Sequence, residues 1–185
     1  ECIIAGGVES MSFVPAAGWK TVPSFQIASD EPDYYLNMGL TAEAVAKEYG
    51  VAREEQDEFS LQSHQKAIAA NEKGHFKSGI LPITVEEIYL DQKQKRQKRS
   101  FVVDTDEGPR ADTSIEALSK LRPAFKEGGV VTAGNSSQMS DGAAAVMLMS
   151  SERAASLGLT PLARFVSFAV GGVAPELMGI GPLVA

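Results

Sequence analysis

The sequence is poor in cysteine and histidine, with Cys2 as its one cysteine and His64 and His75 as its two histidines. A single cysteine allows no internal disulfide, which suits a reducing compartment. So few soft ligands predict no metal site. No HExxH, paired CxxC or Walker A motif is present. Gly179-Ile180-Gly181 lacks the third glycine of a dinucleotide-binding loop, since position 184 is Val.

Long apolar runs and a surplus of positive charge are also missing. No uncharged apolar stretch reaches the roughly eighteen residues that predict a membrane-spanning helix. The net charge of −7 argues against a nucleic acid or an anionic membrane as partner, because both need a broad basic surface. One basic run, 93–99 (KQKRQKR), stands out. No aromatic residue interleaves its charges, so a solvated hairpin tip is favoured over an oligonucleotide-binding site.

Two helical patterns follow an irregular stretch at 8–36, a loop length that is often functional. The first helix is expected to be capped by Thr41 and to end at Gly50. The second is expected over 53–73, where acidic residues cluster at its start. Its packed face is predicted at Phe59, Ser63, Ala67 and Ala70.

Apolar and β-branched runs predict strands between further short helices. Residues 2–5 are expected to form a buried strand that ends in a turn at Gly6-Gly7. Two runs flank the polar segment 91–99 as a hairpin. A turn followed by a strand is expected at 128–133, further strands at 143–149 and 162–170, the hairpin strands at 80–90 and 100–104, and the short helices at 115–121 and 151–157. The apolar run 143–149 also suits a short buried helix. Buried strands that alternate with helices define the α/β class.

Both ends of the sequence are apolar, from Cys2 to Ala5 and from Pro182 to Ala185. Natural termini are more often polar and frayed. The sequence is therefore interpreted as an internal piece of a longer protein.

Two segments invite a functional interpretation. Cys2 has no neighbouring base, so packing in a buried strand is favoured over a role as nucleophile. Residues 131–145 (VTAGNSSQMSDGAAA) are small or carry hydroxyl groups, which allows a ligand to approach the main chain closely. A loop that leads into a buried strand explains the same composition, and composition leaves both interpretations open.

Seven motifs occur in the order in which thiolases carry them. They are Gly6-Gly7-Val8-Glu9-Ser10-Met11-Ser12, Met38-Gly39-Leu40-Thr41-Ala42-Glu43, Glu55-Gln56-Asp57, Asp106-Glu107-Gly108-Pro109-Arg110, Leu121-Arg122-Pro123-Ala124-Phe125, the segment 131–145, and Met178-Gly179-Ile180-Gly181-Pro182. The chain resembles the thiolase family from end to end. It is most similar to the degradative 3-ketoacyl-CoA thiolases.

The resemblance implies a thiolase-like α/β fold with two similar halves, the first of which carries an inserted loop domain that covers CoA. Residues 1–8 would end a segment of the N-terminal core, and 9–139 would form the inserted loop domain. Residues 140–160 would return to the N-terminal core, and 161–185 would begin the C-terminal half.

The resemblance also implies a reaction, the cleavage of 3-oxoacyl-CoA with CoA to acyl-CoA and acetyl-CoA in fatty-acid β-oxidation. Thiolases pass the acyl group through an enzyme cysteine, with a histidine and a second cysteine as base and acid. The segment with the nucleophile belongs before Glu1, and the Asn-Glu-Ala-Phe, Gly-rich-His and Cys-x-Gly motifs belong after Ala185. No catalytic residue is therefore expected in this chain, and residues 1–185 alone are expected to be inactive.

By similarity, five positions would contact coenzyme A or acyl-CoA, which is a substrate and not a resident cofactor. Met38 would flank the pantetheine channel, and Phe125 would pack along it. Ala133 and Ser137 would line the pantetheine, and Arg110 would lie near the phosphates at the adenosine end. The residues themselves allow plainer roles, since Met38 and Phe125 suit a core and Arg110 suits a surface ion pair.

Alternatives within and outside the family remain. Asn37 stands where biosynthetic acetoacetyl-CoA thiolases commonly carry His, which favours the degradative class. A biosynthetic acetyl-CoA C-acetyltransferase is the alternative, and so is a non-catalytic CoA-binding or oligomerising module. The resemblance implies a homo-oligomer, a dimer or tetramer, in an intracellular compartment that is cytoplasmic in bacteria and peroxisomal or mitochondrial in eukaryotes.

Overall fold

The computed structural model describes residues 1–15 and 18–185, which form two compact units. The first unit comprises residues 1–51, 123–131 and 136–185, and the second comprises 52–122 and 132–135. Both units combine helices and strands, so the predicted α/β class is confirmed. Among the described residues, no helix has both the length and the apolar composition needed to cross a membrane.

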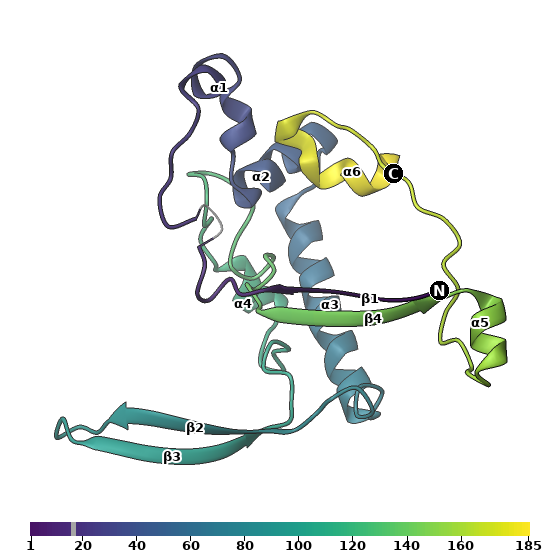
Figure 1. Ribbon diagram of the computed structural model, residues 1–185. Helices are drawn as coiled ribbons and strands as arrows, with labels where there is room; N and C mark the ends of the chain where they lie inside the picture. The colour runs from purple at the N-terminus through teal and green to yellow at the C-terminus, as the bar shows by residue number, and fades with distance from the viewer. Residues whose placement is uncertain (16–17) are drawn as a thin grey trace. The chain divides into compact units, whose positions relative to one another are not determined.

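The first unit contains a two-stranded antiparallel sheet and several helices (Figure 1). Strand β1 pairs with β4 so that Cys2 lies opposite Met149 and Glu9 lies opposite Gly142. The elements of this unit are β1 (Cys2–Glu9), α1 (Phe25–Asp30), η1 (Pro32–Tyr35), α2 (Met38–Tyr49), β4 (Gly142–Met149), α5 (Ser151–Ser156), η2 (Pro175–Ile180) and α6 (Gly181–Val184). Its buried apolar residues are Ala46, Val131 and Ala154.

The second unit is built on one long helix and one hairpin. Its elements are α3 (Arg53–Glu72), β2 (Ile83–Leu90), β3 (Arg96–Val103) and α4 (Ile115–Ser119). Leu118 of α4 is buried in this unit. A Cβ at Gly134 would lie 2.6 Å from the side chains of both Leu118 and Leu121, so Gly134 permits a close approach at this point.

The sheet of the first unit differs from the prediction in burial. The strand at 143–149 is confirmed, and the strand at 2–5 extends through Gly6-Gly7 to Glu9 instead of turning there. Both strands were expected to be buried, yet all residues of β1 are exposed, Cys2 among them. The expectation fails because β1 has only β4 as its strand neighbour in the described chain. Packing does not explain Cys2 here.

Two predicted strands do not form. Residues 162–170 are exposed and have no strand partner in the described chain, and an isolated apolar run does not satisfy its main-chain hydrogen bonds. Residues 128–133 begin with the predicted turn, at Gly128 (φ +67°), in which Gly129 N donates to Lys126 O at 3.0 Å, but no strand follows it within these described residues. Conversely, the stretch 8–36, expected to be irregular, contains the end of β1 as well as α1 and η1.

The helices match the prediction closely in position. Helix α3 spans Arg53–Glu72, and α2 ends at Gly50 in the left-handed conformation (φ 64°). The predicted cap is wrong, because Asn37 and not Thr41 caps α2: Asn37 Oδ1 accepts from Leu40 N at 2.9 Å. The short helices at α4 and α5 are confirmed within their predicted ranges.

The packed face of α3 was predicted correctly only in its second half. Ala67 and Ala70 are partly buried as predicted, whereas Phe59 is 74% exposed and Ser63 is exposed. In the first half of the helix the packed residues are polar, with Asp57 buried and Arg53 and Gln56 partly buried. Polar residues give no hydrophobic periodicity, so the apolar pattern did not reveal this part of the face.

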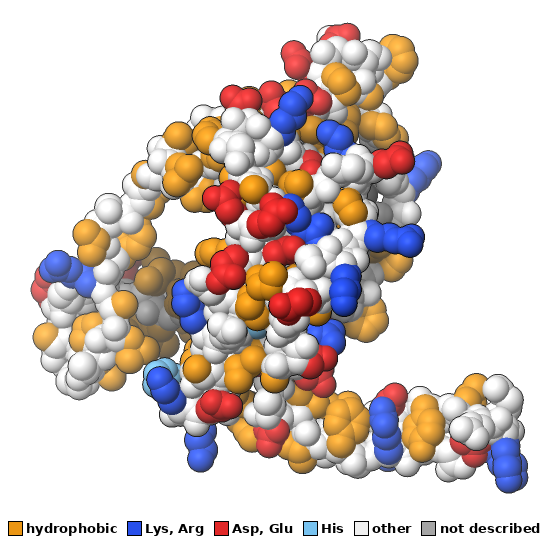
Figure 2. All heavy atoms as spheres, turned by 180° about the vertical axis from the view of Figure 1, so that it is seen from behind, with side chains coloured by type: hydrophobic (Ala, Val, Ile, Leu, Met, Phe, Trp, Pro, Cys, Tyr) orange, Lys and Arg blue, Asp and Glu red, His pale blue; other side chains and the backbone are white. Residues whose placement is uncertain are grey.

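The hairpin of β2 and β3 is confirmed, with a shorter tip than predicted. Asp91 organises the tip, since its Oδ1 accepts from Lys93 N at 2.8 Å and from Lys95 N at 2.9 Å. The rest of the basic run lies in β3, where Lys98 pairs with Glu86 and Arg99 with Glu87. Figure 2 shows basic, acidic and hydrophobic side chains side by side along this hairpin.

Candidate functional site

The start of α2 carries Met38 and Gly39, where Phe125 packs on the helix. Met38 is 58% exposed and Gly39 is buried. A Cβ at Gly39 would overlap the ring of Phe125, so glycine at this position lets the ring lie directly on the helix. Phe125 stays 42% exposed. Two of the five predicted ligand-binding positions are thus brought together in the first unit, with apolar surface open at both.

Glu43, one turn further along α2, holds the segment that follows Phe125. Its Oε1 accepts from Val131 N at 2.8 Å, and both carboxylate oxygens lie 3.0 Å from Val130 N. A Cβ at Gly129 would overlap the Glu43 carboxylate, so glycine is required there too. The carboxylate therefore fixes the main chain at 129–131 against α2.

In the second unit, residues 132–135 form a tight loop of hydrogen-bonded polar residues that includes Ala133. Asn135 Oδ1 accepts from Thr132 N at 2.7 Å, and Thr132 Oγ1 accepts from Gly134 N at 3.1 Å. Asn135 Nδ2 donates to Gln56 Oε1 on α3 at 3.2 Å. Thr132 is completely buried, whereas Ala133 is exposed. The loop thus presents the Ala133 methyl group on a rigid support.

Ser137 lies in the first unit and is exposed. Its hydroxyl lies 3.3 Å from Gln138 O, beyond the usual range of about 2.5–3.0 Å for a hydrogen bond between an O–H and an oxygen acceptor, so this contact is weak.

Arg110 lies in the second unit and is held at both its main chain and its side chain. Its main-chain N donates to His64 Nδ1 of α3 at 3.1 Å. Its guanidinium makes two contacts with Asp112, of 3.3 and 3.2 Å. The hydrogen bond with Asp112 raises the pKa of Arg110 and lowers the pKa of Asp112. The surface ion pair thus forms, and an anionic ligand would have to share the guanidinium with Asp112.

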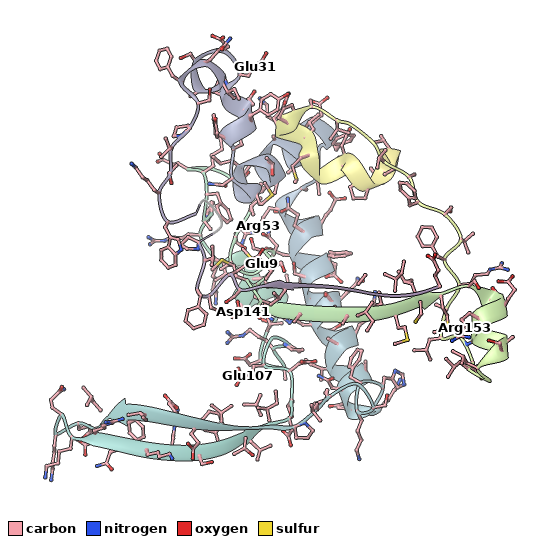
Figure 3. The ribbon with its side chains drawn as sticks, viewed as in Figure 1. Glu9, Glu31, Arg53, Glu107, Asp141 and Arg153 are labelled. Carbon is pink, nitrogen blue, oxygen red and sulfur yellow. The ribbon has the colours of Figure 1, made fainter. Side chains whose placement is uncertain are left out.

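A further carboxylate joins two of the thiolase-like motifs in the first unit. Asp141 Oδ1 accepts from Ser12 N at 2.9 Å, and its Oδ2 accepts from Ser10 Oγ at 3.2 Å. Figure 3 shows Asp141 close to Glu9, where β1 ends and β4 begins. The hydrogen bond from Ser12 N is the main cause that lowers the pKa of Asp141.

Sequence reasoning missed the polar residues that support the site. Glu43 belongs to the motif Met38–Glu43 and Arg53 begins the predicted helix, but neither pattern predicts the contacts that these side chains make. Arg53 in fact bonds Asp57 at 2.8 Å and Leu118 O at 2.7 Å, which ties α3 to α4. Its spacing of four residues from Asp57 was the available signal. Nothing in the sequence marked Gln56 as the partner of Asn135.

The five candidate ligand-binding positions are small, apolar or cationic side chains. Within residues 1–15 and 18–185, no group of three or more potential metal-ligating side chains gathers. Met38, Phe125 and Ser137 belong to the first unit, and Arg110 and Ala133 belong to the second.

Comparison with known proteins identifies the class. The family profile described as "Thiolase, N-terminal domain" matches residues 1–152. The chain therefore belongs to the thiolase family, a family of acyltransferases, and both the resemblance and the predicted fold are confirmed.

Named relatives cover the whole chain. It is 56% identical over 185 residues to "3-ketoacyl-CoA thiolase" of Bacillus subtilis, covering 100% of this chain and 47% of that protein. It is 46% identical over 197 aligned residues to "Acetyl-CoA acetyltransferase" of Pseudomonas aeruginosa, covering 100% of this chain and 48% of that protein. The chain thus spans about half the length of these curated relatives.

Solved structures agree. The crystal structure of the dimeric peroxisomal thiolase of Saccharomyces cerevisiae matches with a TM-score of 0.79 and 38% identity, over 98% of this chain and 44% of that one. Human mitochondrial 3-ketoacyl-CoA thiolase matches with a TM-score of 0.75 and 36% identity, over 98% of this chain and 47% of that one.

Proposed function

We propose that this chain supplies acyl-CoA-binding surface to a degradative 3-ketoacyl-CoA thiolase. The whole protein would cleave 3-oxoacyl-CoA with CoA and release acyl-CoA and acetyl-CoA. The observation that carries the proposal is the exposed apolar pair of Met38 and Phe125, held together through Gly39 at the start of α2.

Each proposed contact follows from the chemistry of its side chain. Met38 and Phe125 offer apolar surface to the pantetheine arm, whose methyl and methylene groups gain by leaving water. Ala133 leaves room beside the main chain, and Ser137 offers a hydroxyl to an amide of the arm. Arg110 offers a planar cation to phosphate oxygens. None of these groups is a nucleophile, base or acid of the reaction, so the catalytic residues are assigned to other parts of the protein.

The degradative assignment rests on two further observations. The B. subtilis relative, at 56% identity, is named a 3-ketoacyl-CoA thiolase, whereas the acetyltransferases of P. aeruginosa and Escherichia coli are 46% and 43% identical. Asn37 is committed to capping α2, and it stands where the biosynthetic class commonly carries His. The acetyltransferase names keep the biosynthetic enzyme as the second candidate.

Assembly into a homo-oligomer is part of the proposal. The yeast structure is named as dimeric, and it matches this chain at 38% identity. We assign this protein a dimer or tetramer of the same kind.

The chain-length profile of the whole protein tests the proposed function. Thiolysis rates would be measured with 3-oxoacyl-CoA substrates from acetoacetyl-CoA upward, each in the presence of CoA. A degradative enzyme turns over the longer substrates as well, because its acyl pocket accepts more than a two-carbon extension. Activity confined to acetoacetyl-CoA would assign the protein to the biosynthetic class.

A further inference from the structure

Glu43 is a buried carboxylate in the middle of α2 that is neutralised by no cation among the described ion pairs. Only 8% of the residue is exposed. Its hydrogen bonds come from the main-chain N–H groups of Val130 and Val131. Burying a charge is costly unless hydrogen bonds compensate it. The bonds from Val130 N and Val131 N offset this cost and at the same time fix the main chain that donates them.

The segment that Glu43 holds is closed on itself and carries Phe125. Ala124 N donates to Val131 O at 2.9 Å, and Gly129 N donates to Lys126 O at 3.0 Å. Phe125 therefore lies on one arm of this small loop, and the two N–H groups that Glu43 binds lie on the other. A constraint on Val130 and Val131 is passed to Phe125 through a few residues of hydrogen-bonded main chain.

Helix α2 contacts the loop at two points four residues apart. Gly39 receives the ring of Phe125, and Glu43 receives the amides of Val130 and Val131. Residues at this spacing lie on the same face of a helix. Both contacts need a missing Cβ, at Gly39 for the ring and at Gly129 for the carboxylate. The two contacts thus hold the loop 124–131 against one face of α2.

We propose that Glu43 is a positioning residue for acyl-CoA binding, which holds the ring of Phe125 over Gly39 and next to Met38 by fixing the amides of Val130 and Val131. This inference rests on the proposed function, because it assigns Phe125 a contact with the ligand. Glu43 itself touches no substrate and takes no part in proton transfer.

Replacement of Glu43 by Gln tests the proposal with little change in side-chain volume. The amide keeps one oxygen, but its NH2 group cannot accept from Val130 N as the second carboxylate oxygen does, and the bonds to the remaining oxygen lose their charge. In the whole protein, E43Q is expected to raise the KM for CoA and for 3-oxoacyl-CoA about tenfold, because weaker bonds to Val130 and Val131 let Phe125 shift and so weaken ligand binding. We expect kcat to change less than about twofold, since the reacting groups are elsewhere. The matched control is E48Q, because Glu48 lies on the same helix and is exposed.

A double-mutant cycle between Glu43 and Phe125 separates positioning from general loss of structure. F125A alone is expected to raise the same KM. If Glu43 acts through Phe125, then E43Q has little further effect on KM in the F125A background. A second variant, G129A, pushes a methyl group against the Glu43 carboxylate and is expected to reproduce the KM increase with Glu43 intact, in case E43Q folds poorly.

The outcomes are distinguishable. If F125A leaves KM unchanged, the assignment of Phe125 to the ligand site is wrong, and with it this inference. If F125A raises KM but E43Q and G129A do not, only the role of Glu43 is overturned. Equal effects of E43Q in the two backgrounds would also overturn it, because the carboxylate would then act independently of the ring.

Discussion

At the residue scale, carboxylates that accept from main-chain N–H groups determine much of the local structure. Glu43 holds Val130 and Val131, Asp91 holds the hairpin tip, and Asp141 holds Ser12. An ionised carboxylate accepts from an N–H group more strongly than a neutral oxygen does. The pKa of Asp91 is lowered mainly by the side-chain bond from Gln97 and further by the main-chain bond from Lys95, and the pKa of Asp141 is lowered mainly by the bond from Ser12 N.

The pKa of Asp141 gives a prediction about acid. The folded protein holds this pKa below its ordinary value of 3.8, mainly through the bond from Ser12 N. A group with a lowered folded pKa adds stability above its unfolded pKa, and that contribution is lost as the pH falls through the folded value. The contribution of Asp141 is therefore expected to be intact above about pH 4 and to disappear below it. A carboxyl titration followed by NMR measures the pKa directly.

D141N is the test variant for Asp141, because it removes the titrating group at this position. D33N in η1 is the control variant. We expect acid to weaken the bonds that Asp141 accepts from residues 10 and 12 in the wild type, and D141N, which keeps one neutral acceptor oxygen, to show the weaker bonds already at neutral pH. An Asp141 carboxyl that titrates at or above 3.8 would contradict the hydrogen-bonded geometry.

At the element scale, helix α2 contacts the loop 124–131 through Gly39 and Glu43, and its N-terminus is capped by Asn37. Asn37 Oδ1 satisfies Leu40 N, one of the free N–H groups at the helix start. N37A is expected to lower the free energy of unfolding by about 1 kcal/mol, and N37D to keep most of it. Denaturant unfolding of the whole protein compares the three forms. An unchanged midpoint for N37A would show that the cap does not stabilise α2.

The sequence predicts these elements unevenly, for physical reasons. Helix ends were predictable where glycine or clustered acids mark them, as at Gly50 and at the start of α3. The cap of α2 was missed because Asn37 and Thr41 both suit a cap, and only the geometry separates them. The apolar run 162–170 was expected to be a strand. A strand also needs a neighbouring strand to pair with, and the apolar pattern of one segment does not say whether such a neighbour exists.

The candidate site was predictable only through the resemblance. Composition gave a ligand-accessible loop at 131–145 and no more. Val130 and Val131 lie 87 and 88 residues from Glu43, and Gln56 lies 79 residues from Asn135, so no local pattern reveals these contacts. The five ligand-binding positions therefore remain a proposal drawn from ordered motifs. The structure adds the contact of the Phe125 ring with Gly39, beside Met38 in the sequence.

At the scale of the whole molecule, the thiolase family is established from two directions. Motifs in family order run from Gly6 to Pro182, and solved thiolases match 98% of the chain. Both strands of the first unit's sheet expose apolar side chains, such as Ile4 at 71% and Met147 at 59%. Contiguous apolar surface of this kind usually marks a face that contacts another part or another molecule.

The most direct test of the central claim uses the exposed methyl group of Ala133. Because this side chain is exposed on a rigid loop, Ala133→Leu is expected to leave folding intact and to obstruct the pantetheine arm. Calorimetric titration of CoA into the whole protein is expected to show at least about tenfold weaker binding for A133L. A42L, at an exposed alanine of α2, serves as the control and is expected to bind as the wild type does. Wild-type CoA affinity in folded A133L would contradict the claim that this chain supplies the acyl-CoA-binding surface.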